Sequence, residues 1–431
     1  MIEKSQVKHS LKKKKSFFIL FPFSIIVQLF SFILLFILLF FLPGCITYTP
    51  YQEKPYKPTR KKEKQEPKIR LLLFNNRTIY HIFTESEDIV IETSNKMDGN
   101  IQHYSNSVGK SEGLEVRIKG NNVLIQNKYY PLPCRIKNLR KFKIGSLNLY
   151  GDLVLYRDSL VLEMPIERYV EGVIASEVGT SWPIEALKAQ AVVSRTYAVY
   201  SILHSKNSHY DLGTSELHQK YELKESIDSV KKAVDATRGI IIYYHSEPIQ
   251  AFYHSCSGGI TESGGNVFSK DLPYLKSIRD PYSRKCPDKY WKLELTSDEI
   301  LRSLGDIKPA SFNNKEITDI QIGAKTSSGR VKFFILRFGR EKVKIRGNAF
   351  RLAMGAKSFK SLLIIRIIKK QRENNKITYE FIGKGYGHGV GMSQWGAKNM
   401  AMQGFSYTSI IKFYYRGVNL DNYNKLHIVG S

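Results

Sequence analysis

The chain has 431 residues, of which 42% are hydrophobic and 12% aromatic, and this excludes a protein that is disordered over most of its length. The length leaves room for two or three packed units. The formal net charge of +27 indicates an anionic partner or anionic surroundings.

The first 45 residues have the features of an export signal. Lys12 to Lys15 form a basic block, residues 16–42 are uncharged and mostly apolar, and the sequence LPGC ends at Cys45. The uncharged stretch is long enough for an uncleaved signal anchor, since about 20 apolar residues span a bilayer. LPGC resembles a bacterial lipobox, which would make Cys45 a lipidation site. Both alternatives predict a membrane-tethered, extracytoplasmic protein of the cell envelope.

Residues 46–67 are expected to form a disordered tether, because Pro50, Pro55, Pro58 and Pro67 lie among many charges. An exported chain is poorly matched to nucleic acid. Cell-wall polymers and anionic lipid headgroups therefore suit the positive charge better.

Apolar residues alternate with polar ones in the next part of the chain, in runs such as IRLLLF, DIVIET and LEVRIKG. Gly, Asn and Asp turns separate these runs, so residues 68–163 are predicted to be rich in β-strands.

Helical spacing begins at Pro165, where Ile166, Val170 and Val173 lie four and three residues apart. After the sequence GTSWP a second helix starts, with Pro183 near its first turn. Further on, strand-like residues precede the loop CSGGITESGG, and a Ser-Ser-Gly turn joins two alternating runs as in a hairpin. The glycine-rich sequence GKGYGHGVGMSQWG then precedes helix-like segments near the end.

These patterns predict an α+β fold with a β-rich N-terminal part, a helical core that lines a cleft, and an insertion that contains a β-hairpin. The expected regions are the signal or anchor 1–45, the tether 46–67, the β-rich part 68–163, the helical core 164–290, the β-containing insertion 291–380, and the glycine-rich loop with its C-terminal helix 381–431.

Glu177 is the first candidate for chemistry. It follows Val173 by four residues and Ile174 by three, so it extends the apolar stripe of the first helix, whereas Glu167 and Glu171 are expected on the opposite face. Partial burial would raise the pKa of this carboxyl and allow it to donate a proton near neutral pH. The alternative is a structural role, either as a cap of the second helix or as an ion-pair partner.

The cysteines and the glycine-rich sequence offer further candidates. Outside the cytoplasm a disulfide between Cys256 and Cys286 is allowed, with Cys134 left free, and zinc bound by these two cysteines and His254 is the alternative. The glycine-rich sequence lets a ligand approach the backbone closely. It lacks the surrounding βαβ unit of a dinucleotide site, and a structural turn is its alternative reading.

Five segments occur in the order found in one family. They are YVEGVIASEV, WPIEALKAQAVVSRTYA, AFYHSCSGGITES, LPYLKSIRDPY and GKGYGHGVGMSQWGA. Over residues 69–418 the chain thereby resembles the SpoIID/LytB domain family of bacterial cell-wall proteins, which includes stage II sporulation protein D and amidase enhancers.

This resemblance implies a lytic transglycosylase that cleaves denuded peptidoglycan glycan strands, those stripped of their stem peptides, and leaves 1,6-anhydro-N-acetylmuramic acid ends. Glu177 falls on the catalytic position of the family. The alternative is a non-catalytic glycan-binding protein that enhances a cell-wall amidase. Neither activity requires a cofactor. The candidate substrate-binding residues are Arg195, Gln219, Tyr221, Tyr386, His388, Ser393 and Gln394.

The chain departs from the family in the segment YDLGTSELHQKY. Gly213 and His218 stand where some members have a pair of metal-binding cysteines, so no metal is predicted there. Gln219 and Tyr221 match the family and suggest that the segment still serves the substrate.

Overall fold

The computed structural model describes residues 66–86, 88–94, 101–107 (backbone only), 113–213, 227–268, 270–312, 315–371 and 376–426. The predicted signal, Cys45 and nearly all of the tether lie outside these residues, as do His218, Gln219 and Tyr221. Glu66 and Pro67, at the end of the predicted tether, are attached to the fold: the amide of Glu167 donates to Glu66, and the amide of Ile166 donates to Pro67.

The N-terminal part is built from two sheets. The first has seven strands in the order β13 (Leu212–Gly213), β1 (Lys68–Asn75), β12 (Ser159–Pro165), β11 (Asp152–Leu155), β8 (Cys134–Lys137), β3 (Asp88–Ser94) and β4 (Ile101–Ser107). The second has six strands in the order β10 (Leu147–Tyr150), β9 (Lys141–Ile144), β2 (Ile79–Thr84), β5 (Leu114–Lys119), β6 (Asn122–Ile125) and β7 (Lys128–Pro131).

Alternation along the strands explains how these two sheets form one core. Every second residue of β1 and β5 is buried, and Leu71 from the first sheet and Val116 from the second belong to the same hydrophobic cluster. Strand β12 is an exception because six consecutive residues, Ser159 to Met164, are buried. A strand buried on both faces loses the alternation that marks an exposed one.

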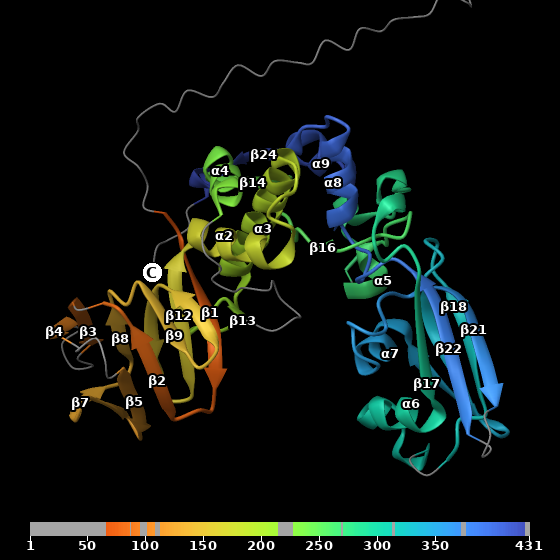
Figure 1. The fold of residues 1–431 in the computed structure, drawn as a ribbon, viewed down its shortest axis with the longest axis horizontal. Helices are drawn as coiled ribbons and strands as arrows, with labels where there is room; N and C mark the ends of the chain where they lie inside the picture. Colours follow the sequence, from red (N-terminus) through yellow and green to blue (C-terminus); the bar gives the residue numbers. More distant parts are fainter. Residues whose placement is uncertain are drawn as a thin grey trace, which may run out of the picture. The chain divides into compact units, whose positions relative to one another are not determined.

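Three helices follow the sheets: α2 (Ile166–Glu177), α3 (Ile184–His204) and α4 (Asp228–Ala236) (Figure 1). Pro165 and Pro183 occupy the positions just before α2 and α3, as the sequence predicts. Helix α3 is buried on two faces, since Leu187 belongs to the N-terminal core and Val192 to a second core. The helix therefore joins the two cores.

The second core contains the C-terminal helices α8 (Gln394–Met402) and α9 (Tyr407–Tyr414). Around it lie two small sheets, one with the order β15 (Glu247–Pro248), β14 (Ile240–Tyr244) and β24 (Asn419–Asn422), and one that pairs β16 (Tyr253–His254) with β23 (Met392–Ser393). Short helices complete this region: α5 (Gly264–Phe268), η1 (Pro273–Leu275) and η2 (Pro281–Lys285). A further short helix, η6 (Tyr423–Lys425), contributes Tyr423 to the N-terminal core.

The insertion has a third core of its own. Its sheets have the orders β17 (Trp291–Thr296), β22 (Ile377–Lys384), β21 (Leu363–Gln371) and β18 (Asp319–Lys325), β19 (Val331–Phe338), β20 (Glu341–Arg346). The turn Thr326 to Arg330 joins β18 and β19 into the expected hairpin. The helical elements are α6 (Ser297–Leu304), η3 (Gly305–Ile307), η4 (Ala310–Phe312) and α7 (Gly347–Ala353).

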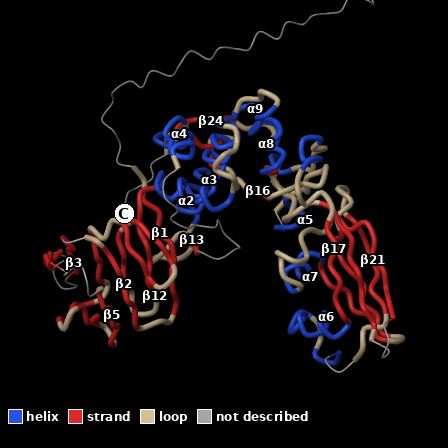
Figure 2. Tube along the Cα trace, viewed as in Figure 1, coloured by secondary structure: helices blue, strands red, loops and turns tan. Residues whose placement is uncertain are grey.

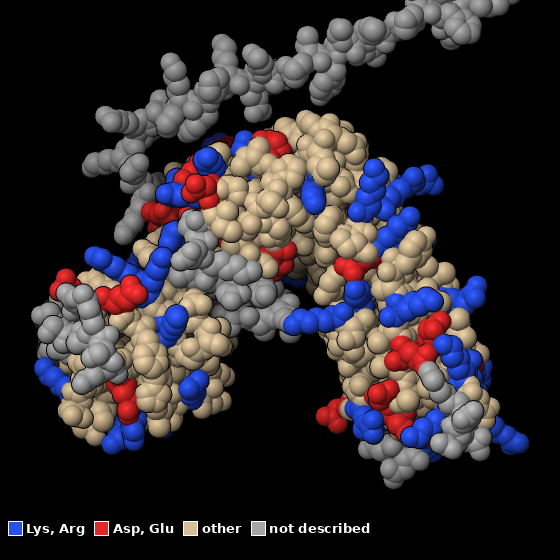
Figure 3. Space-filling view, in the orientation of Figure 1, with Lys and Arg blue, Asp and Glu red and all other residues tan. Residues whose placement is uncertain are grey.

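The fold is thus α+β with a β-rich N-terminal part, as the sequence predicts, and Figure 2 shows the region around β1, β2, β3, β5 and β12 drawn mainly as strands. Lys and Arg side chains are spread over the face drawn in Figure 3, with Asp and Glu between them. Among the described residues no helix combines the length and the apolar character that crossing a bilayer requires. The cleft expected along the helical core stays a prediction.

Candidate functional site

Glu177 is the last residue of α2, and its side chain is partly buried. Val170, Val173 and Ile174 of the same helix are completely buried, so the apolar stripe of α2 leads to the carboxylate as predicted. The negative end of the helix dipole lies at this terminus.

Tyr253 of β16 lies beside Glu177. Its phenol is enclosed, and burial together with the negative charge of Glu177 raises its pKa well above the ordinary value of 10.0. The hydroxyl therefore keeps its proton at neutral pH. Tyr253 was not predicted from the sequence, although it lies inside the family-like segment AFYHSCSGGITES.

Strand pairing brings the glycine-rich sequence to this tyrosine. Tyr253 pairs with Met392 and His254 with Ser393 in parallel register, and the amide of Trp395 donates to the carbonyl of Ser255 (3.1 Å). Helix α8 therefore begins next to the strand that carries Tyr253.

Ser393 and Gln394, at the start of α8, differ in whether their side-chain polar groups already have hydrogen-bond partners. Ser393 is completely buried, and its hydroxyl caps α8 by accepting from the amide of Gly396 (3.2 Å), which is a structural role in place of the predicted contact with substrate. The side chain of Gln394 is 5% exposed, and its amide nitrogen has no hydrogen-bond partner in the described part of the chain. The nitrogen is enclosed, so this donor is unsatisfied unless a water molecule or a ligand group reaches it.

His388 is partly exposed, with its ring edge-on to the rings of Phe252 and Phe268. Burial, and then the positive charges of Arg351 and Arg330, lower its pKa to about 3. Its Nδ1 accepts from the amide of Val390 (3.0 Å), which places the proton of the neutral ring on Nε2. His388 is therefore neutral and cannot serve as an acid near neutral pH, and a hydrogen bond to the backbone of Tyr253 partly opposes the fall in its pKa.

Tyr386 is partly exposed and is tied to the disulfide loop through its backbone. Its amide donates to the carbonyl of Cys256 (2.8 Å), and the amide of Cys256 donates in return (2.9 Å). Its ring remains close to Lys360, whose ammonium lies 5.6 Å from the ring centroid.

Two glycines of the sequence are required by close packing. A Cβ atom at Gly391, where φ is +72°, would lie 1.9 Å from the carbonyl oxygen of Phe252. At Gly389 the guanidinium of Arg330 occupies the space a side chain would need. Arg330 is buried and donates to the carbonyls of Ser257 (2.8 Å) and Ile260, so it binds the insertion to the loop.

A buried carboxylate joins three of the family-like segments. Asp280 accepts from the hydroxyl of Ser257 (2.7 Å) and the amide of Ser283 (3.2 Å), and it lies close to Gly396 of α8. Burial raises the pKa of Asp280, and the hydrogen bonds that it accepts oppose this rise. The network fixes the start of α8 against the loop.

Cys256 and Cys286 form a disulfide with a Cα–Cα distance of 6.3 Å, and Cys134 is a free, buried thiol. The zinc alternative for this pair is therefore excluded, because a disulfide offers no thiolate. Among the described residues no group of three or more His, Cys, Asp or Glu side chains could hold a metal ion.

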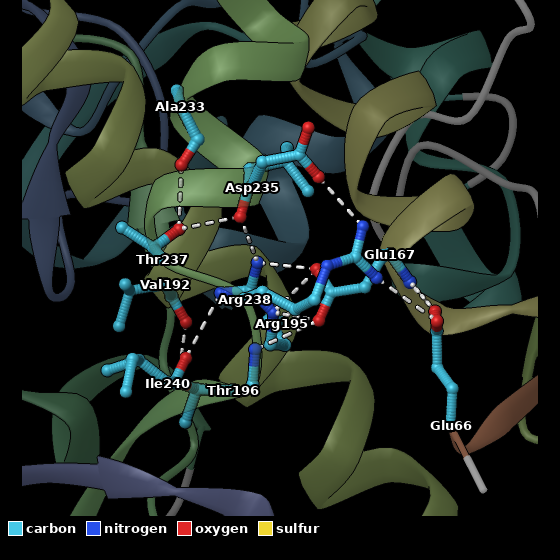
Figure 4. Close-up of polar contacts among 12 residues, drawn as sticks. Glu66, Glu167, Val192, Arg195, Thr196, Ala233, Asp235, Thr237, Arg238 and Ile240 are labelled. Carbon is cyan, nitrogen blue, oxygen red and sulfur yellow. Dashed lines mark hydrogen bonds and ion pairs between the residues drawn. The ribbon is translucent and has the colours of Figure 1, made fainter. Parts of the chain in front are cut away.

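Arg195 has a structural position, which corrects its prediction as a substrate-binding residue. Its side chain is completely buried, and it binds both carboxylate oxygens of Glu167, at 2.9 Å from Nε and 2.6 Å from Nη2 (Figure 4). It also donates to the carbonyl of Ile240 (3.1 Å). No face of the guanidinium is left for a ligand.

Glu167 is likewise buried, whereas the sequence placed it on the face of α2 away from the core. The prediction assumed one buried face. Helix α2 packs against α3, α4 and β12, so a second face is covered as well. Arg195 and the amide of Gly239 (3.1 Å) compensate the buried charge.

Two tryptophans that the sequence analysis did not select meet near Glu177. The rings of Trp182 and Trp395 lie 5.2 Å apart, and both side chains are partly exposed. Trp182 ends the turn that follows Glu177, since its amide donates to the carbonyl of Gly179 (3.0 Å). Both lie in segments that resemble the SpoIID/LytB family, and this resemblance is the feature of the sequence that could have identified them.

Comparisons with known proteins indicate the family of this chain. A family model described as stage II sporulation protein, SpoIID, matches residues 157–244, which include Glu177, and a model described as a domain of unknown function matches residues 282–391. Stage II sporulation protein D of Bacillus amyloliquefaciens is 33% identical over 284 residues, which are 62% of this chain and 77% of the relative. The chain belongs to the SpoIID family.

Other relatives have different names. An uncharacterized protein of Brachyspira hyodysenteriae is 36% identical over 292 residues. The aligned region covers 66% of this chain and 76% of the Brachyspira protein. The amidase enhancer of Bacillus subtilis is 31% identical over 79% of this chain, which corresponds to only 53% of the amidase enhancer. The family thus contains proteins named for sporulation and for the enhancement of an amidase.

Proposed function

We propose that the protein is a lytic transglycosylase that cleaves peptidoglycan glycan strands stripped of their stem peptides. The observation that carries the proposal is the position of Glu177, partly buried at the end of α2 and beside the protonated Tyr253. A carboxyl group in such surroundings is suited to proton transfer.

One carboxyl group can perform both proton transfers of this reaction. Protonated Glu177 donates to the glycosidic oxygen as the bond from N-acetylmuramic acid C1 to that oxygen breaks, and N-acetylglucosamine leaves with a free 4-hydroxyl. The C6 hydroxyl of the same muramic acid then bonds to C1, and its proton returns to Glu177. The product carries a 1,6-anhydro ring, and no water is consumed.

The buried acids of neighbouring segments are poorly placed to assist as a second carboxylate, unlike the pair in ordinary glycosidases. Asp280 is completely buried within its network. Glu262 is 1% exposed and accepts from Ser328 (2.8 Å), Asn266 (2.8 Å) and Thr326. Both acids are occupied by donors, which favours a mechanism with Glu177 alone.

Neutral polar groups of the glycine-rich sequence would orient the sugar. Gln394 offers an unpartnered amide nitrogen and Tyr386 a partly exposed phenol, while His388 is neutral at physiological pH. Such groups stabilise developing charge without exchanging protons themselves. Gln219 and Tyr221 are proposed as further substrate contacts on the family resemblance alone.

The second candidate function is a glycan-binding protein that enhances a cell-wall amidase. The identity to the amidase enhancer over 79% of this chain favours it. In this case the surface proposed to bind glycan would keep that role, and the amidase would carry out the bond cleavage.

We further propose that the protein acts in the cell envelope, where residues 1–45 tether it to a membrane through a lipid on Cys45 or as a signal anchor. The positive charge of the chain would then face anionic wall polymers. Its partners are proposed to be glycan strands and a cell-wall amidase.

Mass spectrometry of the products tests the function. The full-length protein in detergent, given stripped glycan strands, should release fragments with anhydro ends, which are lighter than hydrolysed ends by one water. Glu177→Gln should reduce this release by about 10²-fold or more, since it keeps the shape and removes the transferable proton.

Glu171→Gln is the matched control, because Glu171 lies on the same helix and pairs with Arg168. It should leave the rate nearly unchanged. Anhydro products from Glu177→Gln at the wild-type rate would refute the assignment. A wild-type protein that forms no product but stimulates an added amidase would establish the second candidate instead.

A further inference from the structure

The tryptophans of this chain occupy two kinds of environment. Trp291 lies in the core of the insertion, 5% exposed, and its indole nitrogen donates to Ser361 (3.2 Å). Trp182 and Trp395 are partly exposed, and their indole nitrogens make no hydrogen bond to described residues. Trp291 is therefore a core residue, whereas Trp182 and Trp395 keep ring faces and indole donors available to a ligand.

Lys398 completes a cluster with these two rings. Its ammonium nitrogen lies 4.4 Å from the ring centroid of Trp395 and 5.2 Å from that of Trp182. We call these three residues the tryptophan–lysine cluster. Lys398 is one turn beyond Trp395 on α8, so the helix itself fixes the geometry of the pair.

The ammonium of Lys398 has no acidic partner among the residues that the structure describes. No hydrogen bond or ion pair joins it to them, and its side chain is partly buried. Lys188 on the neighbouring helix α3, by contrast, is paired with Glu185 at 2.7 Å. An unpaired cation held against two rings is suited to bind an anionic group.

The cluster is attached to the chain segments that carry Glu177 and Tyr253. Gly179 packs directly against Trp182, where a Cβ atom would lie 2.5 Å from the indole nitrogen, and Gly179 follows Glu177 by two residues. On the other side the amide of Trp395 is bound to Ser255, which follows Tyr253 by two residues. The cluster is therefore connected to Glu177 through the turn after α2 and to Tyr253 through β16.

We propose that the tryptophan–lysine cluster is a sugar subsite that recognises the free lactyl carboxylate of a muramic acid without a stem peptide. The apolar C–H face of the pyranose ring packs on the indole rings, and Lys398 pairs with the carboxylate. In a strand that still carries its peptide, the same carboxyl group is an uncharged amide. Lys398 thus selects stripped strands, an inference that rests on the proposed function.

Binding measurements test the subsite separately from cleavage. The full-length Glu177→Gln protein in detergent is titrated with stripped glycan strands and with the same strands after conversion of their lactyl carboxylates to methylamides. The native strands should bind about tenfold more tightly, as expected for one partly exposed, charge-assisted hydrogen bond. Adding Lys398→Gln should remove this difference by weakening only the native strands.

Two further variants complete the design. Lys398→Arg should restore most of the preference, and Lys143→Gln, which removes an exposed lysine from β9, should leave it intact. An unchanged preference in Lys398→Gln, or equal binding of both glycans by Glu177→Gln alone, overturns the subsite while the cleavage assay still stands. Loss of the preference in Lys398→Gln supports the subsite even where the wild type forms no anhydro product.

Discussion

Arg195 of α3 binds both carboxylate oxygens of Glu167, which lies in the first turn of the same helix that ends at Glu177. The pair is removed from solvent, with side-chain exposures of 0% and 2%. The helix that carries Glu177 and the helix that follows it are therefore joined by a buried ion pair.

Arg195→Met should lower the free energy of unfolding by about 3–5 kcal/mol, because it leaves the carboxylate of Glu167 buried without its partner. Unfolding in urea, followed by circular dichroism, measures the change. The double variant with Glu167→Met should recover part of the loss. Arg168→Met, which removes a partly exposed pair with Glu171, should change stability by less than about 1 kcal/mol. If Arg195→Met changed the free energy of unfolding as little as Arg168→Met, the structural role of Arg195 would be contradicted.

Tyr253→Phe should preserve the fold, because the ring stays in place and only the enclosed hydroxyl, which interacts with Ser194, is removed. It should slow glycan cleavage by roughly tenfold, since it removes a protonated group that lies beside Glu177. Steady-state rates on stripped strands measure this. Full activity of a folded Tyr253→Phe protein would show that the phenol serves packing alone.

Stability should decrease in acid partly through His388. Its pKa is about 3 in the folded protein and near the ordinary 6.5 in the unfolded chain, so the unfolded chain binds the extra proton between these values. The contribution of neutral His388 to the free energy of unfolding is complete above about pH 6.5 and is lost as the pH falls toward 3. The slope of this loss is at most about 1.4 kcal/mol per pH unit. The pKa of buried His254 is also lowered well below 6.5, and it acts in the same direction.

Urea unfolding at several pH values between 7 and 4 tests this dependence. His388→Gln should flatten it, whereas His81→Gln, which changes an exposed histidine of β2, should not. Identical slopes for His388→Gln and the wild type would show that His388 titrates normally in the folded protein.

The disulfide should be found by peptide mapping as a linked pair of Cys256 and Cys286. Its reduction should lower stability by about 3 kcal/mol, given the loop of 30 residues that it closes. Cys134 should resist alkylation in the folded protein, because burial raises the pKa of its thiol to about 12. Free alkylation of Cys256 and Cys286 in protein isolated without reductant would refute the pairing.

Cys45→Ala should abolish labelling by a fatty-acid probe if Cys45 is lipidated. Metabolic labelling of cells that produce either form measures this, with Cys134→Ala as the control that should keep the label. A label retained by Cys45→Ala, or absent from the wild type, would leave the signal anchor as the explanation.

The sequence alone was sufficient for features that depend on local physics. Alternating residues predicted β1 and β5, prolines marked the starts of α2 and α3, and the stripe from Val173 predicted the partial burial of Glu177. In each case residues within a few positions of one another determine the outcome, through the period of a strand or helix or the restricted backbone of proline.

The tertiary structure decided which distant side chains meet. Periodicity shows which face of α2 is buried but not that a second face is covered, so it misplaced Glu167 and left the partner of Arg195 open. Likewise no local pattern brings Trp182 to Trp395, because they lie at the starts of α3 and α8, which meet only when these two helices pack together. Contacts between distant segments depend on the packing of the whole chain, whereas propensity and period act over single elements.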